Sequence, residues 1–160
     1  MVCMGNICRS PLAQGVLQYK LGRAGLDQRV QVASAGTHSD RGSPADPRAV
    51  AAAARRGYDL AAIRSRRLVD ADFERYQWLI AMDESNHRVL LERCPAGLQG
   101  RVGLLLDLAP RRDGEREVPD PYYGAPNGFE RVLDLIEPAC DALVARLSQQ
   151  LTTPAKVNAD

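Results

Sequence analysis

The sequence Val2-Cys3-Met4-Gly5-Asn6-Ile7-Cys8-Arg9-Ser10-Pro11 stands at the start of a chain of 160 residues. It has the pattern Cys-x5-Arg-Ser, followed by a proline that suits the first turn of a helix. A loop that curls back before a helix start points its backbone N–H groups inward, and the helix dipole adds partial positive charge there. The stretch therefore predicts a loop that binds a phosphate group at the beginning of a helix.

The side chains of this loop suit the same chemistry. Gly5 and Asn6 tolerate the positive φ angles that a tight curl requires. Arg9 offers a planar fork that matches two phosphate oxygens. In that field the thiol of Cys3 is expected to lose its proton readily and to become a nucleophile beneath the phosphorus. The alternative for Cys3 is an ordinary buried cysteine, and the neighbouring Arg9 and Ser10 argue against it.

Two separate runs of the sequence resemble one protein family. The run from Cys3 to Pro11 closely resembles the active-site loop of the low-molecular-weight protein tyrosine phosphatases, and Asp120-Pro121-Tyr122-Tyr123-Gly124 resembles a second catalytic signature of that family. The resemblance covers roughly residues 2–150. It implies hydrolysis of protein phosphotyrosine and small aryl phosphates through a phosphocysteine intermediate, with Cys3 and Arg9 as catalytic residues. The phosphate-binding set that it implies is Met4, Gly5, Asn6, Ile7, Cys8, Arg9 and Ser10.

The resemblance assigns a general acid and a pocket wall to the second run. Asp120 is expected to protonate the leaving phenolate and then to deprotonate the water of the second step. Asp-Pro by itself is more often a turn, and Asp107 and Asp113 are weaker candidates for the acid. Tyr122 and Tyr123 are expected to wall a deep, narrow pocket that admits phosphotyrosine and leaves the shorter phosphoserine out of reach.

Ser10 and Cys8 each have two readings. The hydroxyl of Ser10 is expected to donate to the sulfur of Cys3, and it can also cap the helix that Pro11 begins. The family resemblance implies a reversible disulfide between Cys3 and Cys8 that protects the nucleophile from over-oxidation. A packing role for Cys8 is equally compatible with the sequence.

Strand and helix patterns alternate along the chain, which predicts a parallel sheet with helices on both faces. The expected fold is a single three-layer α/β domain over residues 1–150, followed by a disordered tail at 151–160. The family resemblance adds a four-stranded sheet of order 2-1-3-4 with the phosphate loop at the switch point. Beyond the short strand before Cys3, strands are predicted at 30–37, 78–82 and 102–106, and helices at 11–25, 47–57, 71–76, 84–93 and from 127 onward. The residues between 107 and 126 are predicted to form a long functional loop. The expected helix caps are Ser10, Asp46, Asp70 and Asn127 with Glu130.

Composition limits the partners and the cellular compartment. The net charge is +1 and no apolar run could cross a bilayer, so we expect no nucleic-acid and no membrane partner. The four cysteines lack zinc-like spacing, so no metal and no cofactor are expected, and they fit a reducing cytoplasm. The expected partners are phosphotyrosine proteins, with a bacterial tyrosine kinase as one candidate. The expected assembly is a monomer or a weak dimer.

Three features depart from the family pattern. Only Met1 and Val2 precede Cys3, where relatives carry an apolar first strand, so we expect a truncated start. Ile63 stands where many relatives have a histidine that supports the phosphate loop. The segment 38–42 lacks the aromatic residue that relatives often place on the pocket rim, which makes this rim more polar.

Two alternatives to a phosphatase remain open on the sequence. One is an arsenate reductase of the same fold, which needs further cysteines for a disulfide relay; Cys94 and Cys140 do not form a close pair. The other is a catalytically weak module that binds phosphate or phosphopeptides.

Overall fold

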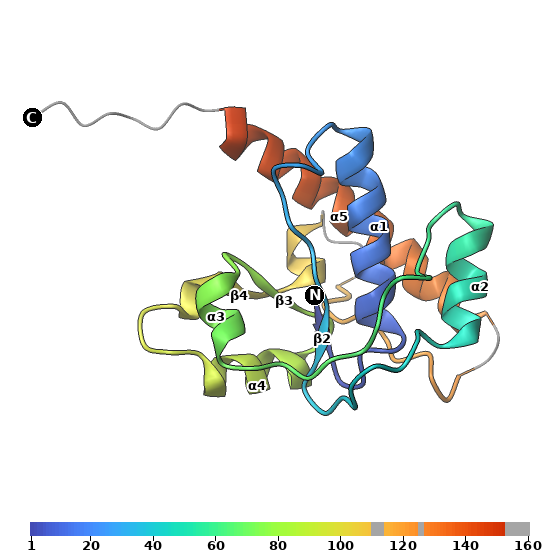
Figure 1. Cartoon of the computed structure of the whole chain (residues 1–160), viewed down its shortest axis with the longest axis horizontal. Helices are drawn as coiled ribbons and strands as arrows, with labels where there is room; N and C mark the ends of the chain where they lie inside the picture. Colours follow the sequence, from blue (N-terminus) through green and yellow to red (C-terminus); the bar gives the residue numbers. More distant parts are fainter. Residues whose placement is uncertain (110–113, 125–126, 153–160) are drawn as a thin grey trace, which may run out of the picture.

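A computed structural model describes residues 1–109, 114–124 and 127–152 of the chain. In this part the chain forms a four-stranded parallel sheet with helices on both faces (Figure 1). The strands are β1 (Val2–Cys3), β2 (Ala35–Gly36), β3 (Leu79–Ala81) and β4 (Val102–Leu104), in the order β2-β1-β3-β4. The α/β class and the strand order predicted from the sequence are confirmed.

β1 lies at the centre of the sheet, between β2 and β3. Val2 pairs with Ala35 on one side and with Ala81 on the other, and Cys3 pairs with Gly36. Successive side chains of a strand point to opposite faces of the sheet. Val2 accordingly packs in the core on one face and Cys3 in the core on the other.

The helices divide between these two faces (Figure 1). α1 (Arg9–Arg23), α2 (Pro47–Arg55) and α5 (Gly128–Thr152) build the larger core, and α3 (Ala71–Arg75) and α4 (Glu84–Arg93) build the smaller one. Fully buried side chains fill both cores, such as Leu12, Val16, Phe129 and Ile136 in the larger core and Phe73 and Leu90 in the smaller one. Burying this apolar surface holds the helices against the sheet.

The start of α1 differs from the prediction. The helix begins at Arg9, with Cys8 in the N-cap position and no side-chain capping bond. The prediction that Ser10 caps this helix is wrong, because Ser10 lies inside the first turn and its hydroxyl contacts the sulfur of Cys3. The first turn is therefore shaped by its contact with the loop rather than by a local cap.

The other helix starts show how tertiary contacts compete with local capping. Asp46 caps α2 as predicted, since its Oδ1 accepts from the backbone N–H of Arg48 at 2.8 Å. Asp70 precedes α3 but forms no capping bond, and its carboxylate accepts instead from Arg93 at 2.6 Å. The carboxylate of Glu130 accepts from the guanidinium groups that end α2, which ties α5 to α2.

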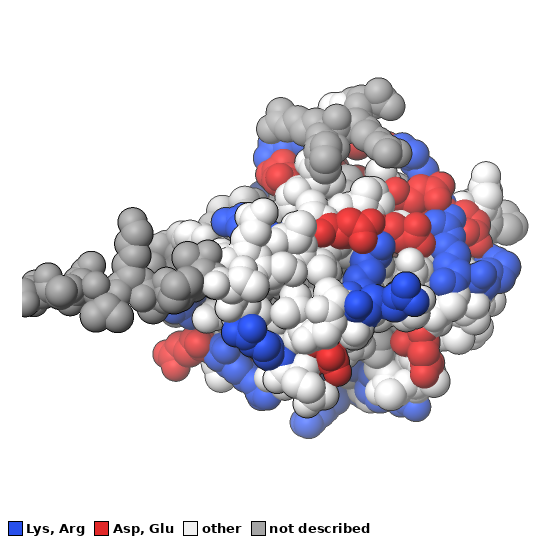
Figure 2. Space-filling model, turned by 90° about the horizontal axis from the view of Figure 1, so that it is seen from above, with Lys and Arg blue, Asp and Glu red and all other residues white. Residues whose placement is uncertain are grey.

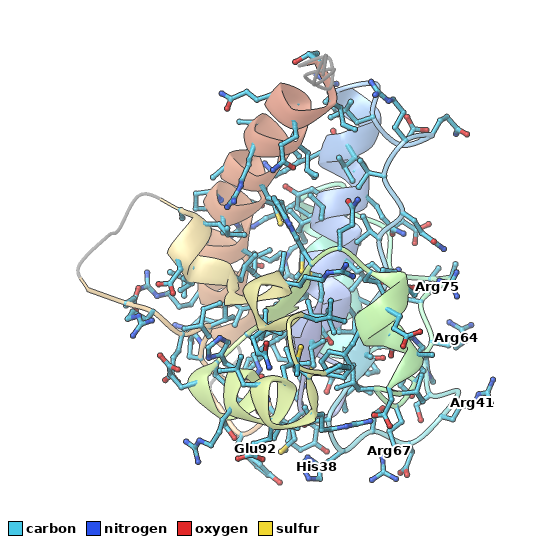
Figure 3. The ribbon with its side chains drawn as sticks, turned by 90° about the vertical axis from the view of Figure 1, so that its left-hand side faces the viewer. His38, Arg41, Arg64, Arg67, Arg75 and Glu92 are labelled. Carbon is cyan, nitrogen blue, oxygen red and sulfur yellow. The ribbon has the colours of Figure 1, made fainter. Side chains whose placement is uncertain are left out.

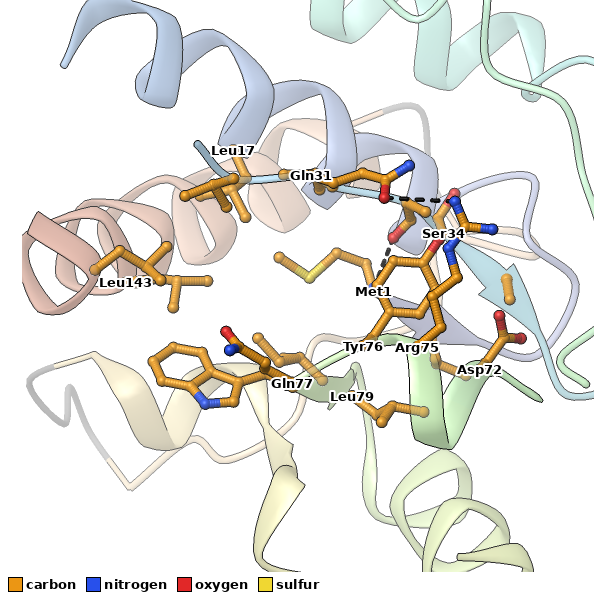
Figure 4. A pocket seen from close by; sticks show the side chains of 18 of the residues that line it. Met1, Leu17, Gln31, Ser34, Asp72, Arg75, Tyr76, Gln77, Leu79 and Leu143 are labelled. Carbon is orange, nitrogen blue, oxygen red and sulfur yellow. Dashed lines mark hydrogen bonds between the residues drawn. The ribbon is translucent and has the colours of Figure 1, made fainter. Parts of the chain in front are cut away.

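The β2 strand is shorter than the apolar run that predicted it. The pattern predicted a strand at 30–37, whereas only Ala35–Gly36 is paired as a strand. Ala35 and Gly36 pair with Val2 and Cys3 of β1, and the amine of Met1 donates to the carbonyl of Ala33 at 2.9 Å. A groove of about 510 Å³ lies between the segments 30–35 and 76–80 (Figure 4).

This groove lies at the amino edge of the sheet, away from the end of β1 that carries Cys3. Its lining includes Leu17, Trp78 and Leu143. Burial, with the nearby charge of Arg66, lowers the pKa of the Met1 amine to about 6. The groove is thus separate from the phosphate loop.

The end of the chain also differs in detail from the prediction. β4 is flanked by two short 3₁₀ helices, η1 (Gln99–Arg101) and η2 (Leu105–Leu108), so the predicted strand at 102–106 ends at Leu104. Of the long loop predicted at 107–126, residues 110–113 and 125–126 lie outside the described part. α5 continues through Thr152, past the predicted domain end, and residues 153–160 of the predicted tail are outside the described part. In the described ranges, none of the helices combines the length and the apolar character needed to cross a membrane.

Candidate active site

The loop between β1 and α1 lies at the carboxyl edge of the sheet, where the strand order reverses. Three of its carbonyl groups accept backbone hydrogen bonds of 2.8–2.9 Å from the segment 37–46. The C=O and N–H groups of a trans peptide point in opposite directions, so carbonyls held on the outside turn the following N–H groups toward the inside. The bonded pairs, donor first, are Thr37 with Cys3, His38 with Met4, and Asp46 with Ile7.

Gly36 allows the loop and this segment to approach so closely. A Cβ atom at Gly36 would lie 2.6 Å from the carbonyl oxygen of Met4 and 2.5 Å from the Cβ of Ser39. Because neither backbone can move without displacing the loop, a side chain at this position is excluded. The glycine therefore sets the distance between the phosphate loop and its outer support.

Asn6 shapes the loop from inside, as the sequence predicted. Its φ of 54° is the one positive value among the non-glycine residues of the described part. Its Nδ2 donates to Ser10 Oγ and to Ser34 Oγ, both at 2.9 Å, and its Oδ1 accepts from the backbone N–H of Arg66. Ser34 in turn donates to Gln14 at 2.6 Å. Every polar atom of the buried amide thus has a partner, which stabilises the strained backbone.

Ile63 stands at the position where the family resemblance implies a histidine that supports the phosphate loop. Ile63 is buried in the larger core. The amide of Asn6 is held instead by the backbone of Arg66 and, through Ser34, by the side chain of Gln14. The role of Gln14 could have been suspected from its position on α1, one turn after Ser10 on the same side of the helix.

Cys3 lies at the base of the loop and is 3% exposed. The backbone N–H of Asn6 donates to its sulfur at 3.3 Å, and the hydroxyl of Ser10 lies 3.0 Å from it. Since the oxygen of Ser10 already accepts from Asn6, its proton is available for the sulfur. The backbone N–H of Asn6 and the hydroxyl of Ser10 therefore both lie within hydrogen-bond distance of the sulfur, and donation by Ser10 stays a prediction.

Arg9 is buried at the mouth of the loop and binds two carboxylates. Its NH1 donates to Asp83 at 2.5 Å and to the carbonyl of Val118 at 3.1 Å. Its NH2 donates to Asp120 at 3.0 Å. The structure thus brings Asp120 to the phosphate loop across 111 positions of sequence.

Asp83 is a site residue that the sequence analysis missed. It follows β3 directly, and its Oδ1 caps α4 by accepting from Asn86 N at 2.7 Å. Its Oδ2 holds Arg9 in place. The signal that could have identified it is an acidic residue just after a buried strand, because the carboxyl ends of parallel strands meet at one edge of the sheet.

Asp120 is one of three acidic candidates on the predicted long loop. Its side chain remains 40% exposed, and its Oδ1 accepts from the backbone N–H of Tyr122 at 3.1 Å, so it also shapes its own turn. Asp107 instead forms an ion pair with Arg116 at 3.1 Å. Asp113 lies outside the described residues.

The two tyrosines after Asp120 differ in exposure. Tyr122 is 42% exposed and Tyr123 is 94% exposed. Their rings meet edge to face, with centroids 4.8 Å apart. Tyr122 is held by contacts to α2, whereas the ring of Tyr123 lies in solvent beyond it.

Arg48 of α2 is the second site residue that the sequence analysis missed. Its guanidinium donates to the carbonyl of Tyr122 at 3.1 Å and lies over the rings of Tyr122 and Phe129. It also pairs with Asp46, and hydrogen bonds from Arg48 hold the pKa of Asp46 below its usual range. Because the backbone N–H of Asp46 donates to Ile7, Arg48 connects the loop that carries Asp120 to the phosphate loop.

Arg48 is therefore expected to act as a positioning residue for Asp120. We expect Arg48→Ala to lower kcat by about tenfold to a hundredfold, since small displacements of a catalytic group have effects of that size. The loss should be larger for phenyl phosphate than for p-nitrophenyl phosphate, because only the poorer leaving group needs the acid. Arg48→Lys should restore the activity only partly, since an ammonium cannot form the same fork. Equal losses on both substrates would contradict this role.

The cysteines are all unpaired thiols in the structure. Burial raises the pKa of Cys8 to about 12, and the nearby carboxylates of Asp46 and Asp120 add to the effect. Cys94 lies in the smaller core, and burial raises the pKa of Cys140 to about 12 in the larger one. The disulfide between Cys3 and Cys8 stays a prediction. Among the described residues, no group of three or more His, Cys, Asp or Glu side chains is placed to hold a metal ion.

A parallel α/β sheet that carries a Cys-x5-Arg loop at its switch point, with an aspartate bound to that arginine, is the arrangement of a cysteine-dependent phosphatase. Residues 1–153 match the family model described as low molecular weight phosphotyrosine protein phosphatase. The chain belongs to this family. The predicted family and the predicted activity, that of a protein tyrosine phosphatase, are confirmed.

Similar proteins of known sequence or structure cover the chain almost entirely. A putative low molecular weight protein-tyrosine-phosphatase of Synechocystis is 40% identical over 94% of this chain and 96% of its own length. A low molecular weight protein-tyrosine-phosphatase of Streptomyces coelicolor is 38% identical over 94% of this chain and 93% of its own length. The crystal structure of a protein tyrosine phosphatase from Entamoeba histolytica superposes with a TM-score of 0.88 at 38% identity and covers 94% of this chain and 96% of that one.

Proposed function

We propose that this phosphatase works through a covalent phosphocysteine on Cys3, with Arg9 as the phosphate-binding residue and Asp120 as the general acid. The observation that carries the proposal is the convergence on one loop of the sulfur of Cys3, two donors to it, and an arginine bound to Asp120. Hydrogen bonds to the sulfur stabilise an anion there. Inward N–H groups and the guanidinium supply donors for the three equatorial oxygens of a phosphoryl group.

In the first step the thiolate of Cys3 attacks phosphorus and forms an S–P bond. The bond from phosphorus to the tyrosine oxygen breaks, and its electron pair leaves with that oxygen, which takes a proton from Asp120. A phosphate dianion on Arg9 competes with Asp120 for the guanidinium, which frees the carboxyl group of Asp120 to face the leaving oxygen.

In the second step Asp120 accepts a proton from water, and the oxygen of this water attacks phosphorus. The S–P bond breaks, its electron pair returns to Cys3, and inorganic phosphate leaves. The hydroxyl of Ser10, 3.0 Å from the sulfur, stabilises the returning thiolate. The other loop residues of the predicted phosphate-binding set contribute their backbone N–H groups.

The substrate class follows from the depth of the loop and from the tyrosines beside it. Cys3 is buried, whereas Met4 of the same loop and Tyr122, two residues after Asp120, have exposed side chains. In this proposal these two side chains flank an entering aromatic ring. A phenyl ring between phosphate and backbone reaches such a nucleophile, whereas a serine side chain is shorter. Tyr123 contributes less than predicted to the wall in this proposal, because its ring is almost fully exposed.

The test compares a phosphotyrosine peptide with its phosphoserine counterpart, with p-nitrophenyl phosphate as the reference. We expect hydrolysis of the aryl phosphate and of phosphotyrosine, competitive inhibition by inorganic phosphate, and no measurable turnover of phosphoserine. Equal rates on the two peptides would contradict a pocket that selects phosphotyrosine.

An arsenate assay with thioredoxin tests the alternative function, that of an arsenate reductase. The burial of Cys94 and Cys140 in two different cores argues against a disulfide relay from Cys3.

We also propose a cytoplasmic location and a tyrosine kinase as a partner. The free thiols of the structure suit a reducing compartment. The kinase follows from the substrate class, because a phosphotyrosine residue is made by a tyrosine kinase. Capture of phosphoproteins from the source cell with a substrate-trapping variant would identify the partner directly.

A further inference from the structure

Two segments lie side by side along the outer wall of the phosphate loop. Residues 36–44 hold the carbonyls of the loop, and residues 64–68 run beside them. Backbone hydrogen bonds of 2.8 Å and two isolated bridges join these segments. The bonds run from Gly42 N to Ser65 O and from Ser65 N to Ser43 O, and the bridges pair Pro44 with Arg64 and Gly36 with Arg67.

Three arginines of these segments, Arg41, Arg64 and Arg67, form what we name the basic strip. Their exposed side chains lie along one edge of the molecule, which His38 continues (Figure 3). The backbone N–H of His38 donates to the carbonyl of Met4 in the phosphate loop at 2.9 Å. In the ranges that the structure describes, none of the three lies within ion-pair distance of a carboxylate. Arg64 donates to the carbonyls of Ala61 and Ile63, which fixes its side chain without neutralising its charge.

The acidic groups near the strip are few. Asp40 precedes Arg41, and Glu92 is seen next to His38 at the lower end of the molecule in the view of Figure 3. Asp72 is buried and bound to Arg66 at 2.8 Å. The strip therefore keeps a net positive charge.

Several arginines elsewhere on the surface are neutralised by ion pairs. Figure 2 shows basic and acidic side chains next to one another on the face seen from above. Arg55 and Arg56 at the end of α2 pair with Glu130, Asp134 and Glu137 of α5. The three arginines of the strip have no such partner in the described residues, and they differ from other arginines without an ion pair, such as Arg23, in lying together beside the support of the phosphate loop.

We propose that the basic strip binds acidic residues that flank the phosphotyrosine of a protein substrate. A peptide whose phosphotyrosine enters the loop passes over the segment 37–44, because this segment forms the wall beside Met4. Acidic side chains on that part of the peptide meet three exposed guanidinium groups, each of which can bind a carboxylate through a fork of two donors. The proposal rests on the phosphotyrosine activity above and adds the sequence preference of the same site.

The test measures kcat/KM for two phosphotyrosine peptides of equal length, one flanked by Asp and Glu and one by Ser and Gln. At low ionic strength we expect the acidic peptide to be preferred by about tenfold, which several exposed ion pairs can supply. At roughly 0.5 M salt the preference should fall toward unity, because screening acts over about 10 Å already at 0.1 M. A ratio near unity at low salt would overturn the proposal.

Variants assign the preference to the strip. The double change Arg64→Gln with Arg67→Gln should bring the ratio of the two kcat/KM values toward unity, and Arg64→Lys with Arg67→Lys should retain most of it. Arg23→Gln is the matched control, since Arg23 is an exposed arginine in the last turn of α1, at the other end of this helix from the phosphate loop. Because both peptides are measured with the same preparation, a loss of folded enzyme lowers both kcat/KM values equally and leaves their ratio unchanged. A ratio that the double glutamine variant leaves unchanged would overturn the proposal, whereas failure of the unchanged protein to hydrolyse p-nitrophenyl phosphate would count against the proposed function instead.

Discussion

Cys3→Ser is expected to abolish turnover of p-nitrophenyl phosphate and of phosphotyrosine peptides. A serine hydroxyl is only slightly smaller than a thiol, so the loop and its hydrogen bonds should persist. An alcohol, however, does not ionise near neutral pH, and the donors around this position cannot supply a general base to activate it. Binding of inorganic phosphate should survive, because the N–H groups and Arg9 are unchanged.

Rapid quench with a labelled aryl phosphate measures the same step directly. We expect label on the sulfur of Cys3 within the first turnover of the unchanged protein and none in Cys3→Ser. Cys94→Ala is the control, since Cys94 is a thiol of the smaller core, on the other face of the sheet. Steady turnover by Cys3→Ser, or label that never appears on Cys3, would refute the covalent mechanism.

Asp120→Ala is expected to lower kcat by a factor of about 10²–10⁴ for substrates with poor leaving groups, the range found for positioned acid–base groups. Unsubstituted phenolate has a parent pKa near ~10 and requires a proton as it departs. The loss in this first step should shrink for p-nitrophenyl phosphate, whose leaving group is stabilised without a proton. Comparing phenyl and p-nitrophenyl phosphate in single-turnover experiments therefore isolates the acid function.

Asp107→Ala is the matched control for this variant. Asp107 is an acidic residue of the same predicted loop, but it binds Arg116 rather than Arg9. Its removal should leave both rates near those of the unchanged protein. Near-normal rates of Asp120→Ala on phenyl phosphate would show that the acid is another residue, and Asp83, which also binds Arg9, would then be the candidate to test.

The fold was predictable because its signals are local or repeat along the chain. Alternating apolar runs and capped periodic segments predicted the α/β class, and the strand order followed from the family resemblance. The errors occur where a tertiary contact overrides a local preference. Ser10 contacts the sulfur of Cys3 instead of capping α1, and of the run 30–37 only Ala35–Gly36 pairs with β1 as a strand.

The candidate site was predictable only in part. Cys3, Arg9 and Ser10 lie in one contiguous run, so their proximity follows from loop and helix geometry alone. Asp83 caps α4 and Arg48 lies in the first turn of α2, near helix starts that the sequence pattern predicted. Their second contacts, to Arg9 and to Tyr122, span 74 positions each, and no local pattern predicts them.

The sequence by itself determined the phosphate loop and its reactive side chains. Cys-x5-Arg-Ser is a short-range pattern, and local backbone geometry is enough to bring these side chains together. The support of that loop is different. Only the tertiary structure places Arg9 between two carboxylates and bonds Arg48 to the segment that carries Asp120. It also forms the basic strip. These contacts arise because parallel strands bring their carboxyl ends to one edge of the sheet. Packing of the two cores determines which distant side chains meet at this edge, and no local sequence pattern encodes those contacts.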